Sequence, residues 1–141
     1  MSTQPVTVDA SIIVNAFSPS EEGSDKSWEY INSLKRKGTP IIVPALVLPE
    51  IVSAISRKHN KNSRFGIRLA EEIRNIPNLA LIPLDEFMAE QAVSIAATYN
   101  LRSSDAIYVA VALRFGTDLV TLDREQLTKL GKILSVKTPE P

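Results

Sequence analysis

The sequence contains no cysteine and only one histidine among its 141 residues. Without cysteine, the chain forms no disulfide framework, carries no thiol nucleophile and offers no thiolate ligands to zinc. A single histidine also excludes a multi-histidine metal centre within one chain. Glycine is scarce, and the five glycines form neither a phosphate-binding loop nor a dinucleotide fingerprint, which disfavours nucleoside triphosphatases and dehydrogenases. Any chemistry must therefore depend largely on carboxylates and hydroxyls.

Neither sign of charge is in excess, because sixteen basic residues balance sixteen acidic ones. The balance argues against binding nucleic acid through overall charge, although it does not exclude binding through a local basic strip. Long apolar runs are also lacking, and none approaches the ~20 residues of a membrane span. The first residues place no lysine or arginine before an apolar stretch, as a secretory signal would. We therefore expect a cytoplasmic protein without a membrane partner, with one domain at residues 1–137 and a loose tail at 138–141.

Short apolar runs and longer amphipathic segments alternate along the chain. The runs predict strands at residues 5–8, 40–43, 79–82 and 119–122, with a fifth candidate at 133–136. The amphipathic segments predict helices at residues 25–37, 46–57, 64–75, 85 or 86–99, 103–115 and 124–130, and a further helix from Ser11. We expect Ser103 or Ser104 to cap the helix that ends at Phe115. Near-continuous apolar strands are typical of parallel sheets buried on both faces, so the pattern predicts an α/β fold with a mostly parallel sheet.

Apolar helix faces predict the core. The helix that carries Asp105 is apolar on almost every side, which predicts that it is buried centrally and holds Asp105 rigidly. Seven aromatic residues stand at helical spacings within apolar faces, and we expect most of them in the core: Trp28, Tyr30, Phe65, Phe87, Tyr99, Tyr108 and Phe115.

Four acidic residues stand where a parallel sheet would gather them. Asp9 and Asp123 each follow a predicted strand directly, and parallel strands end at the same edge of a sheet. Glu50 lies near the start of the helix after the second strand, which begins at that edge. Asp105 lies in the first turn of a helix that follows another helix, so the topology does not fix its position. Each acid taken alone is also explained as a helix cap or a dipole-favoured acid, worth ~0.3–1 kcal/mol.

The convergence of all four acids would have a further consequence. Carboxylates within a few ångströms repel one another, so their pKa values rise unless a cation offsets the charge. Because the available ligands are oxygen atoms, the natural cations are Mg²⁺ and Mn²⁺. The sequence therefore predicts a carboxylate site for a hard divalent cation.

The sequence contexts of these acids resemble those of PIN domains. They are residues 8–11 (VDAS), 48–51 (LPEI), 104–110 (SDAIYVA) and 119–123 (LVTLD). The resemblance covers nearly the whole chain and is greatest to the VapC-type toxins of prokaryotic toxin–antitoxin pairs. It implies a three-layer α/β/α sandwich whose central sheet has four to five strands. One departure is Leu127, which stands where many PIN domains have an aromatic residue.

The same resemblance implies an activity and a site. It implies an Mg²⁺- or Mn²⁺-dependent endoribonuclease that hydrolyses RNA phosphodiester bonds, with a cognate antitoxin and a homodimeric state as further expectations. The implied catalytic and metal-holding residues are Asp9, Glu50, Asp105 and Asp123. Ser11 and Thr121 are implied to support them by hydrogen bonding to carboxylates or to a metal-bound water.

A basic strip lies close to the predicted site. Five basic residues and no acid occupy residues 57–68, namely Arg57, Lys58, Lys61, Arg64 and Arg68. Arg57 lies two turns beyond Glu50 on the same helix face, about 10 Å away, so the strip could bind an RNA phosphate. The alternative is a solvated helix end whose cations complement the helix dipole. His59, in the same strip, is expected to be a surface residue and not a general base.

Other functions remain as alternatives. A phospho-receiver needs paired acids after its first strand, where Asp9 is followed by Ala10, and Asp85 only partly fits its third-strand acid. A dehalogenase-type phosphatase needs Asp-x-Asp, which residues 9–11 lack. A non-catalytic PIN-like module that binds RNA or protein stays open, because the four acids argue against it without excluding it.

Overall fold

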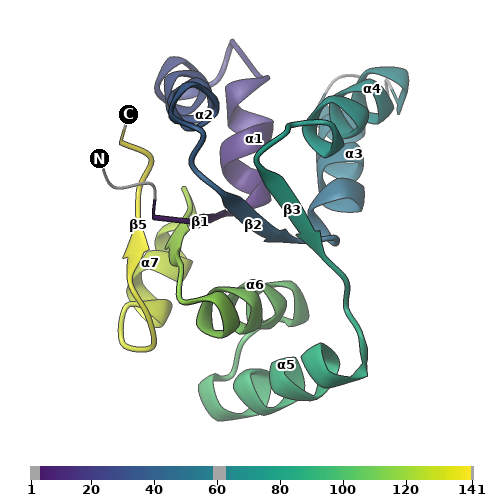
Figure 1. Ribbon diagram of the computed structural model, residues 1–141. Coiled ribbons are helices and arrows are strands. Elements are labelled where there is room, and N and C mark those ends of the chain that lie inside the picture. Colours follow the sequence, from purple (N-terminus) through teal and green to yellow (C-terminus); the bar gives the residue numbers. More distant parts are fainter. Residues whose placement is uncertain (1–3, 59–62, 141) are drawn as a thin grey trace.

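Five parallel strands form one sheet in the computed structural model, which describes residues 4–58 and 63–140 (Figure 1). The strands are β1 (Val6–Val8), β2 (Ile41–Pro44), β3 (Leu79–Ile82), β4 (Asp118–Val120) and β5 (Val136–Lys137). Their order is β3-β2-β1-β4-β5, and every neighbouring pair is parallel. The predicted α/β fold with a mostly parallel sheet is confirmed, and across the described residues the sheet is wholly parallel.

Helices cover both faces of this sheet (Figure 1). On one face lie α1 (Ala10–Ala16), α2 (Ser24–Lys37), α3 (Val47–Lys58) and α4 (Ser63–Arg74). On the other face α6 (Ser103–Phe115) contacts β1, β2 and β4, and α5 (Glu86–Tyr99) packs outside α6. The last helix, α7 (Arg124–Leu130), joins β4 to β5. The three-layer α/β/α arrangement is therefore confirmed, and no helix of the described residues is long and apolar enough to cross a membrane.

The order of the strands reverses at β1. The chain passes from β1 to β2 to β3 in one direction and then returns past β1 to form β4 and β5. The connections that leave β1 and β3 consequently run over opposite faces of the sheet (Figure 1). Open α/β sheets bind ligands at such a reversal, beyond the carboxyl ends of the strands. The topology therefore predicts a ligand-binding site at the edge of the sheet where β1 and β4 end.

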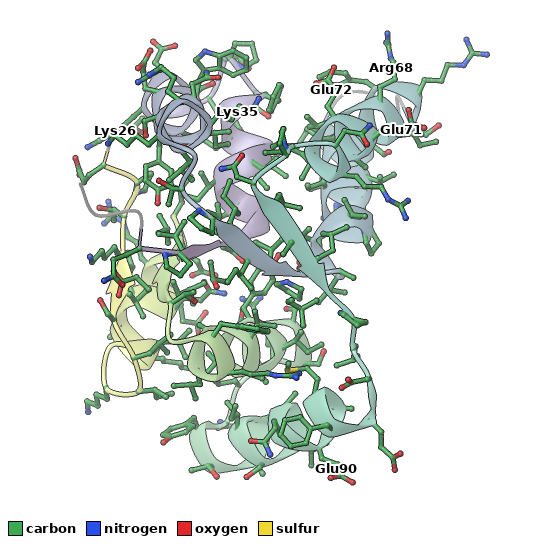
Figure 2. The ribbon with its side chains drawn as sticks, in the orientation of Figure 1. Lys26, Lys35, Arg68, Glu71, Glu72 and Glu90 are labelled. Carbon is green, nitrogen blue, oxygen red and sulfur yellow. The ribbon has the colours of Figure 1, made fainter. Side chains whose placement is uncertain are left out.

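The core is built as the apolar runs predict. Val8, Val43 and Leu119 of the three central strands are buried, because both faces of the sheet are covered. Helix α6 is buried over most of its length, from Asp105 to Ala112. Charged side chains of the outer helices point away from the sheet, as Lys35 and Glu90 do in Figure 2. The central burial predicted for α6 is confirmed.

Most predicted boundaries lie within one residue of the observed ones, and three differences have a clear cause in the hydrogen bonds. Strand β4 ends at Val120 and not at residue 122, because the Leu122 amide leaves the sheet to donate to the Ser11 hydroxyl. Strand β5 begins at Val136, because the Ile133 amide donates to the Leu130 carbonyl and closes the end of α7. The cap of α6 is Arg102 and neither serine, since the Arg102 carbonyl already accepts the first helical bond from Ala106.

The expectation that most of the seven aromatic residues are core is wrong. Tyr30 and Tyr108 are buried, but four others are exposed: Trp28, Phe87, Tyr99 and Phe115. These lie on the margins of the apolar helix faces, where a neighbouring side chain covers only part of each ring. Trp28 packs edge-on against Phe17 at the elbow between α1 and α2, with ring centroids 5.2 Å apart. The Arg114 guanidinium lies 5.4 Å from the ring centres of both Phe87 and Phe115.

Candidate active site

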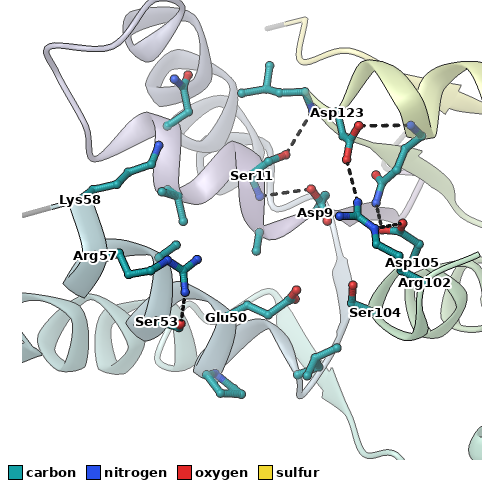
Figure 3. A pocket seen from close by; sticks show the side chains of 18 of the residues that line it. Asp9, Ser11, Glu50, Ser53, Arg57, Lys58, Arg102, Ser104, Asp105 and Asp123 are labelled. Carbon is teal, nitrogen blue, oxygen red and sulfur yellow. Dashed lines mark hydrogen bonds and ion pairs between the residues drawn. The ribbon is translucent and has the colours of Figure 1, made fainter.

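A cavity of about 620 Å³ opens at the carboxyl edge of the sheet, where β1 and β4 end (Figure 3). All four predicted acids line it, although they come from four separate parts of the fold. They are Asp9 after β1, Glu50 in α3, Asp105 in the first turn of α6 and Asp123 before α7. The structure therefore brings together residues that are more than one hundred positions apart in sequence.

Asp9 is one of the buried residues of this cavity. Its Oδ2 accepts hydrogen bonds from the Ser11 amide and the Thr121 hydroxyl, both at 3.2 Å, and the first of these caps α1. Burial raises the pKa of Asp9, and the nearby Asp105 charge raises it further, against the lowering effect of the bonds from Ser11 and Thr121. The ionised carboxylate is thus held at a cost that a cation would relieve.

The two hydroxyls predicted to support the acids connect the β1 and β4 ends. The Thr121 hydroxyl donates to Asp9 and accepts from the Asp123 amide at 3.0 Å, so it orients both acids. The Ser11 hydroxyl accepts from the Leu122 amide at 3.2 Å and lies 3.5 Å from the Thr121 hydroxyl. These contacts fix the segment before Asp123 against the start of α1.

Glu50 faces Tyr108, a residue that the sequence analysis assigned only to the core. The Tyr108 hydroxyl donates to Glu50 Oε1 at 2.8 Å. Burial raises the pKa of Glu50, and the charges of Asp9 and Asp105 raise it further, while the Tyr108 bond lowers it. A signal was present in the sequence, because Tyr108 stands three residues after Asp105 and so projects from the same face of α6.

The Tyr108 hydroxyl can be tested by removing it. We expect Tyr108→Phe to raise the pKa of Glu50 further and to cost about 1–2 kcal/mol of folding stability, because a buried bond to a carboxylate is lost. Carbon-detected NMR titration of the Glu50 carboxyl and urea denaturation measure the two effects. Tyr99→Phe is the matched control, since Tyr99 is exposed and should change neither quantity. An unchanged Glu50 titration in Tyr108→Phe would show that the hydroxyl does not tune this acid.

Arg102 and Gln126 hold Asp105, and neither was singled out from the sequence. Arg102 Nε donates to Asp105 Oδ2 at 3.1 Å, and the Gln126 amide donates to Asp105 Oδ1. Arg102 Nη2 also donates to Asp123 Oδ2 at 3.3 Å, while Asp123 Oδ1 caps α7 by accepting from the amides of Glu125 and Gln126. Gln126 is the third residue of α7, a position from which a glutamine commonly reaches back past the helix cap.

The donor types in the cavity suit a hard divalent cation. Mg²⁺ and Mn²⁺ prefer carboxylate oxygens, and the raised pKa values of Asp9 and Glu50 indicate an excess of negative charge. Within the described residues, however, no three acidic or histidine side chains are placed so that they could hold one ion together. In the same cavity, Arg102 bridges Asp105 and Asp123, and Glu50 faces Tyr108. The residues fit the cation in their chemistry, with two of the four acids already paired to an arginine.

Only part of the predicted basic strip reaches the cavity. Arg57 and Lys58 line it (Figure 3), and Lys58 forms an ion pair with Glu21, another of the lining residues. Arg64, on α4, is exposed and is not among the lining residues. Lys61 and His59 lie outside the described residues.

Asn15 belongs to the wall of the cavity and not to the helix surface. It is buried, its amide donates to the Glu22 carbonyl at 3.0 Å, and its Oδ1 accepts from the Ser27 hydroxyl at 2.8 Å. These two bonds hold the start of α2 against α1, so the bonding atoms of Asn15 are engaged within the protein.

Comparison with known proteins identifies the family. Residues 6–133 match the family model of the PIN domain. The chain belongs to the PIN domain family. A comparison with curated protein sequences found no match.

Solved structures of toxins and toxin–antitoxin complexes share this fold. Mycobacterium tuberculosis VapC20, described as a sarcin–ricin loop cleaving toxin, superposes with a TM-score of 0.74 at 16% identity over 87% of this chain and 93% of its own. A toxin–antitoxin complex from Klebsiella pneumoniae gives 0.67 at 20% identity, covering 95% and 97%. VapBC2 from Rickettsia felis, bound to a DNA fragment from its promoter, gives 0.68 at 13% identity, covering 96% and 98%. The PIN fold of this chain is thus the fold of VapC toxins.

Proposed function

We propose that this PIN domain is a divalent-metal-dependent endoribonuclease and the toxin of a toxin–antitoxin pair. The observation that carries the proposal is the convergence of four carboxylates from four separate parts of the fold on one cavity. Any one acid is explained as a helix cap, and Asp9 and Asp123 do cap helices. Capping does not explain why Asp9 and Glu50 lie in surroundings that bury them and raise their pKa values.

The proposed roles follow from the position of each side chain. Asp9 and Asp123 would hold Mg²⁺ or Mn²⁺ directly, and Glu50 and Asp105 would complete the site through water or hold a second ion. The bound cation supplies Lewis-acid stabilisation of the phosphodiester and activation of water. Ser11 and Thr121 keep Asp9 and Asp123 oriented. Such fixed orientation matters because small displacements of metal ligands are costly to activity.

RNA is proposed as the substrate because cations line the cavity beside the acids. Arg57 and Lys58 lie at its mouth and are placed to bind a phosphate that flanks the scissile bond. Lys61 and Arg64, which continue the strip, are proposed to bind phosphates farther along the strand. VapC20, which has the same fold, is itself described as a sarcin–ricin loop cleaving toxin.

An antitoxin and a second copy of the chain are the proposed protein partners. The Klebsiella pneumoniae structure is a toxin–antitoxin complex, and the Rickettsia felis structure holds both proteins of its pair on DNA. A short open reading frame beside the gene would support the antitoxin, and sedimentation of the purified chain would test the homodimer. Both proposals rest on likeness to these relatives.

The nuclease is tested by the dependence of RNA cleavage on metal. We expect the purified chain to cleave total bacterial RNA with Mg²⁺ or Mn²⁺, to lose the activity in EDTA and to regain it when the metal is restored. Glu90→Gln is a control for the loss of one acid, because Glu90 points outward from α5 (Figure 2). Equal cleavage with metal and with EDTA would refute the metal-dependent mechanism. Absence of cleavage under every condition would favour the non-catalytic binding module.

A further inference from the structure

Arg102 is a basic residue that contacts two of the acids of the cavity. It is the cap residue of α6, and its guanidinium lies between two carboxylates from different helices (Figure 3). Nε donates to Asp105 Oδ2 at 3.1 Å and Nη2 donates to Asp123 Oδ2 at 3.3 Å. One side chain thus joins the start of α6 to the start of α7.

The two oxygens bound by Arg102 are the ones that a cation between Asp105 and Asp123 would use. The second oxygen of each carboxylate is already hydrogen-bonded. Asp105 Oδ1 accepts from the Gln126 side-chain amide, and Asp123 Oδ1 caps α7. Arg102 and a divalent cation therefore compete for the same oxygens.

The contacts made by Arg102 are of a kind that can be exchanged. Its side chain is 67% exposed, and ion pairs made by exposed side chains are weak because water screens them. The bond from Gln126 is buried and keeps Asp105 in place when the arginine leaves. Asp123 likewise stays anchored through its cap to α7. The acids can therefore exchange the arginine for another cation without losing their orientation.

We propose that Arg102 is a built-in counter-ion that offsets the charges of Asp105 and Asp123 without metal and lowers the affinity of the site for divalent cations. The proposal rests on the metal site of the proposed function. It assigns to Arg102 a role distinct from binding RNA: metal must displace the guanidinium from at least one acid. Removing the guanidinium should therefore strengthen metal binding while weakening the metal-free fold.

Calorimetric titration with MnCl₂ and MgCl₂ tests the first effect. We expect Arg102→Gln to bind either ion about threefold to tenfold more tightly than the wild type, because a weak competitor has been removed. Arg124→Gln is the matched control: Arg124 follows Asp123 directly and is exposed, so its loss removes the same charge without opening a bridge. The gain in metal affinity of Arg124→Gln should be clearly smaller than that of Arg102→Gln. Arg102→Lys, which keeps the charge but lacks the forked geometry, should fall between the wild type and Arg102→Gln.

Thermal unfolding tests the second effect. In EDTA, Arg102→Gln should melt below both the wild type and Arg124→Gln, since Asp105 and Asp123 are left without a shared cation. Saturating Mg²⁺ should remove most of that difference. Metal binding by Arg102→Gln that is equal to or weaker than that of the wild type overturns the counter-ion role.

The result also separates this inference from the proposed function. Wild-type binding that requires Asp9, without a gain in Arg102→Gln, overturns the counter-ion role and leaves the nuclease proposal standing. Binding by Arg102→Gln alone supports the counter-ion role in its strongest form. Absence of binding in both proteins overturns both proposals.

Discussion

Asp9→Asn is expected to reduce metal-dependent RNA cleavage by at least about 100-fold. Groups that merely support a metal ligand cost 10–100-fold when they are lost, so removing a ligand should cost no less. Asparagine is as good a helix cap as aspartate, so α1 should keep its start. The loss would therefore report on the charge of Asp9 and not on misfolding. Single-turnover cleavage at saturating Mg²⁺ measures it.

The same substitution should stabilise the metal-free fold. Because burial raises the pKa of Asp9 above its ordinary 3.8, ionisation costs the folded state more than the unfolded state. This penalty is absent below the ordinary pKa, grows as the pH rises through the raised pKa, and is complete above it. Asp9→Asn should therefore melt above the wild type at pH 7 in EDTA, with the difference shrinking towards pH 4. Saturating Mg²⁺ should reverse the order, since only the wild type gains stability by binding it.

Asp85→Asn provides the control for a capping aspartate outside the cavity. Asp85 caps α5 by accepting from the Met88 amide at 2.8 Å, and it does not line the cavity. We expect this variant to keep its activity and to melt within a degree or two of the wild type, because asparagine caps as well as aspartate. An Asp9→Asn protein that cleaves RNA at the wild-type rate would contradict the assignment of Asp9 as a ligand.

Ile12→Ala is expected to cost about 3–4 kcal/mol of folding free energy, within the 2–5 kcal/mol typical of such truncations. Ile12 is completely buried in α1, a helix of only seven residues whose sequence carries Ser11 into the cavity wall. Isolated helices of this length are not stable in water, so packing must hold α1 in place. Urea denaturation followed by circular dichroism should show a lower midpoint with an unchanged slope.

Ile67→Ala is the matched control for this truncation. Ile67 is also helical, in α4, but half of it is exposed, so the same change should cost less than about 1.5 kcal/mol. Both changes gain equally from the higher helix propensity of alanine. Equal losses in the two variants would show that α1 is not held by the burial of Ile12.

The fold could be predicted from the sequence because its signals are local. Apolar runs bounded by proline or aspartate gave the first three strands, and residues with left-handed backbones, such as Gly38 and Gly116, end helices where expected. The errors in the strands arose where a bond to a distant segment, as at Leu122, or a turn at a helix end overrides the apolar pattern. Ile133 continues an apolar run, yet its amide closes the end of α7 and removes it from the sheet.

The acids of the site were predictable, and their partners were not. Parallel strands end at one edge, so the gathering of Asp9 and Asp123 follows from topology. Arg102, Tyr108 and Gln126 each stand three residues from one of the acids in sequence. That spacing places two side chains on one helix face, but so many residues share it that it selects none of them. Only the tertiary hydrogen bonds from Tyr108 to Glu50 and from Gln126 to Asp105 show which neighbours reach a carboxylate.

The elbow between α1 and α2 gives the chain a built-in optical probe. Trp28 is its only tryptophan, half exposed, with its ring packed edge-on against Phe17. Phe17 follows the last turn of α1, about 12 Å along the helix from Asp9, so the indole lies away from the acids. Its emission should shift to the red when the elbow opens and stay constant when only the acids change partner. Native fluorescence can therefore follow unfolding of this corner without an added dye.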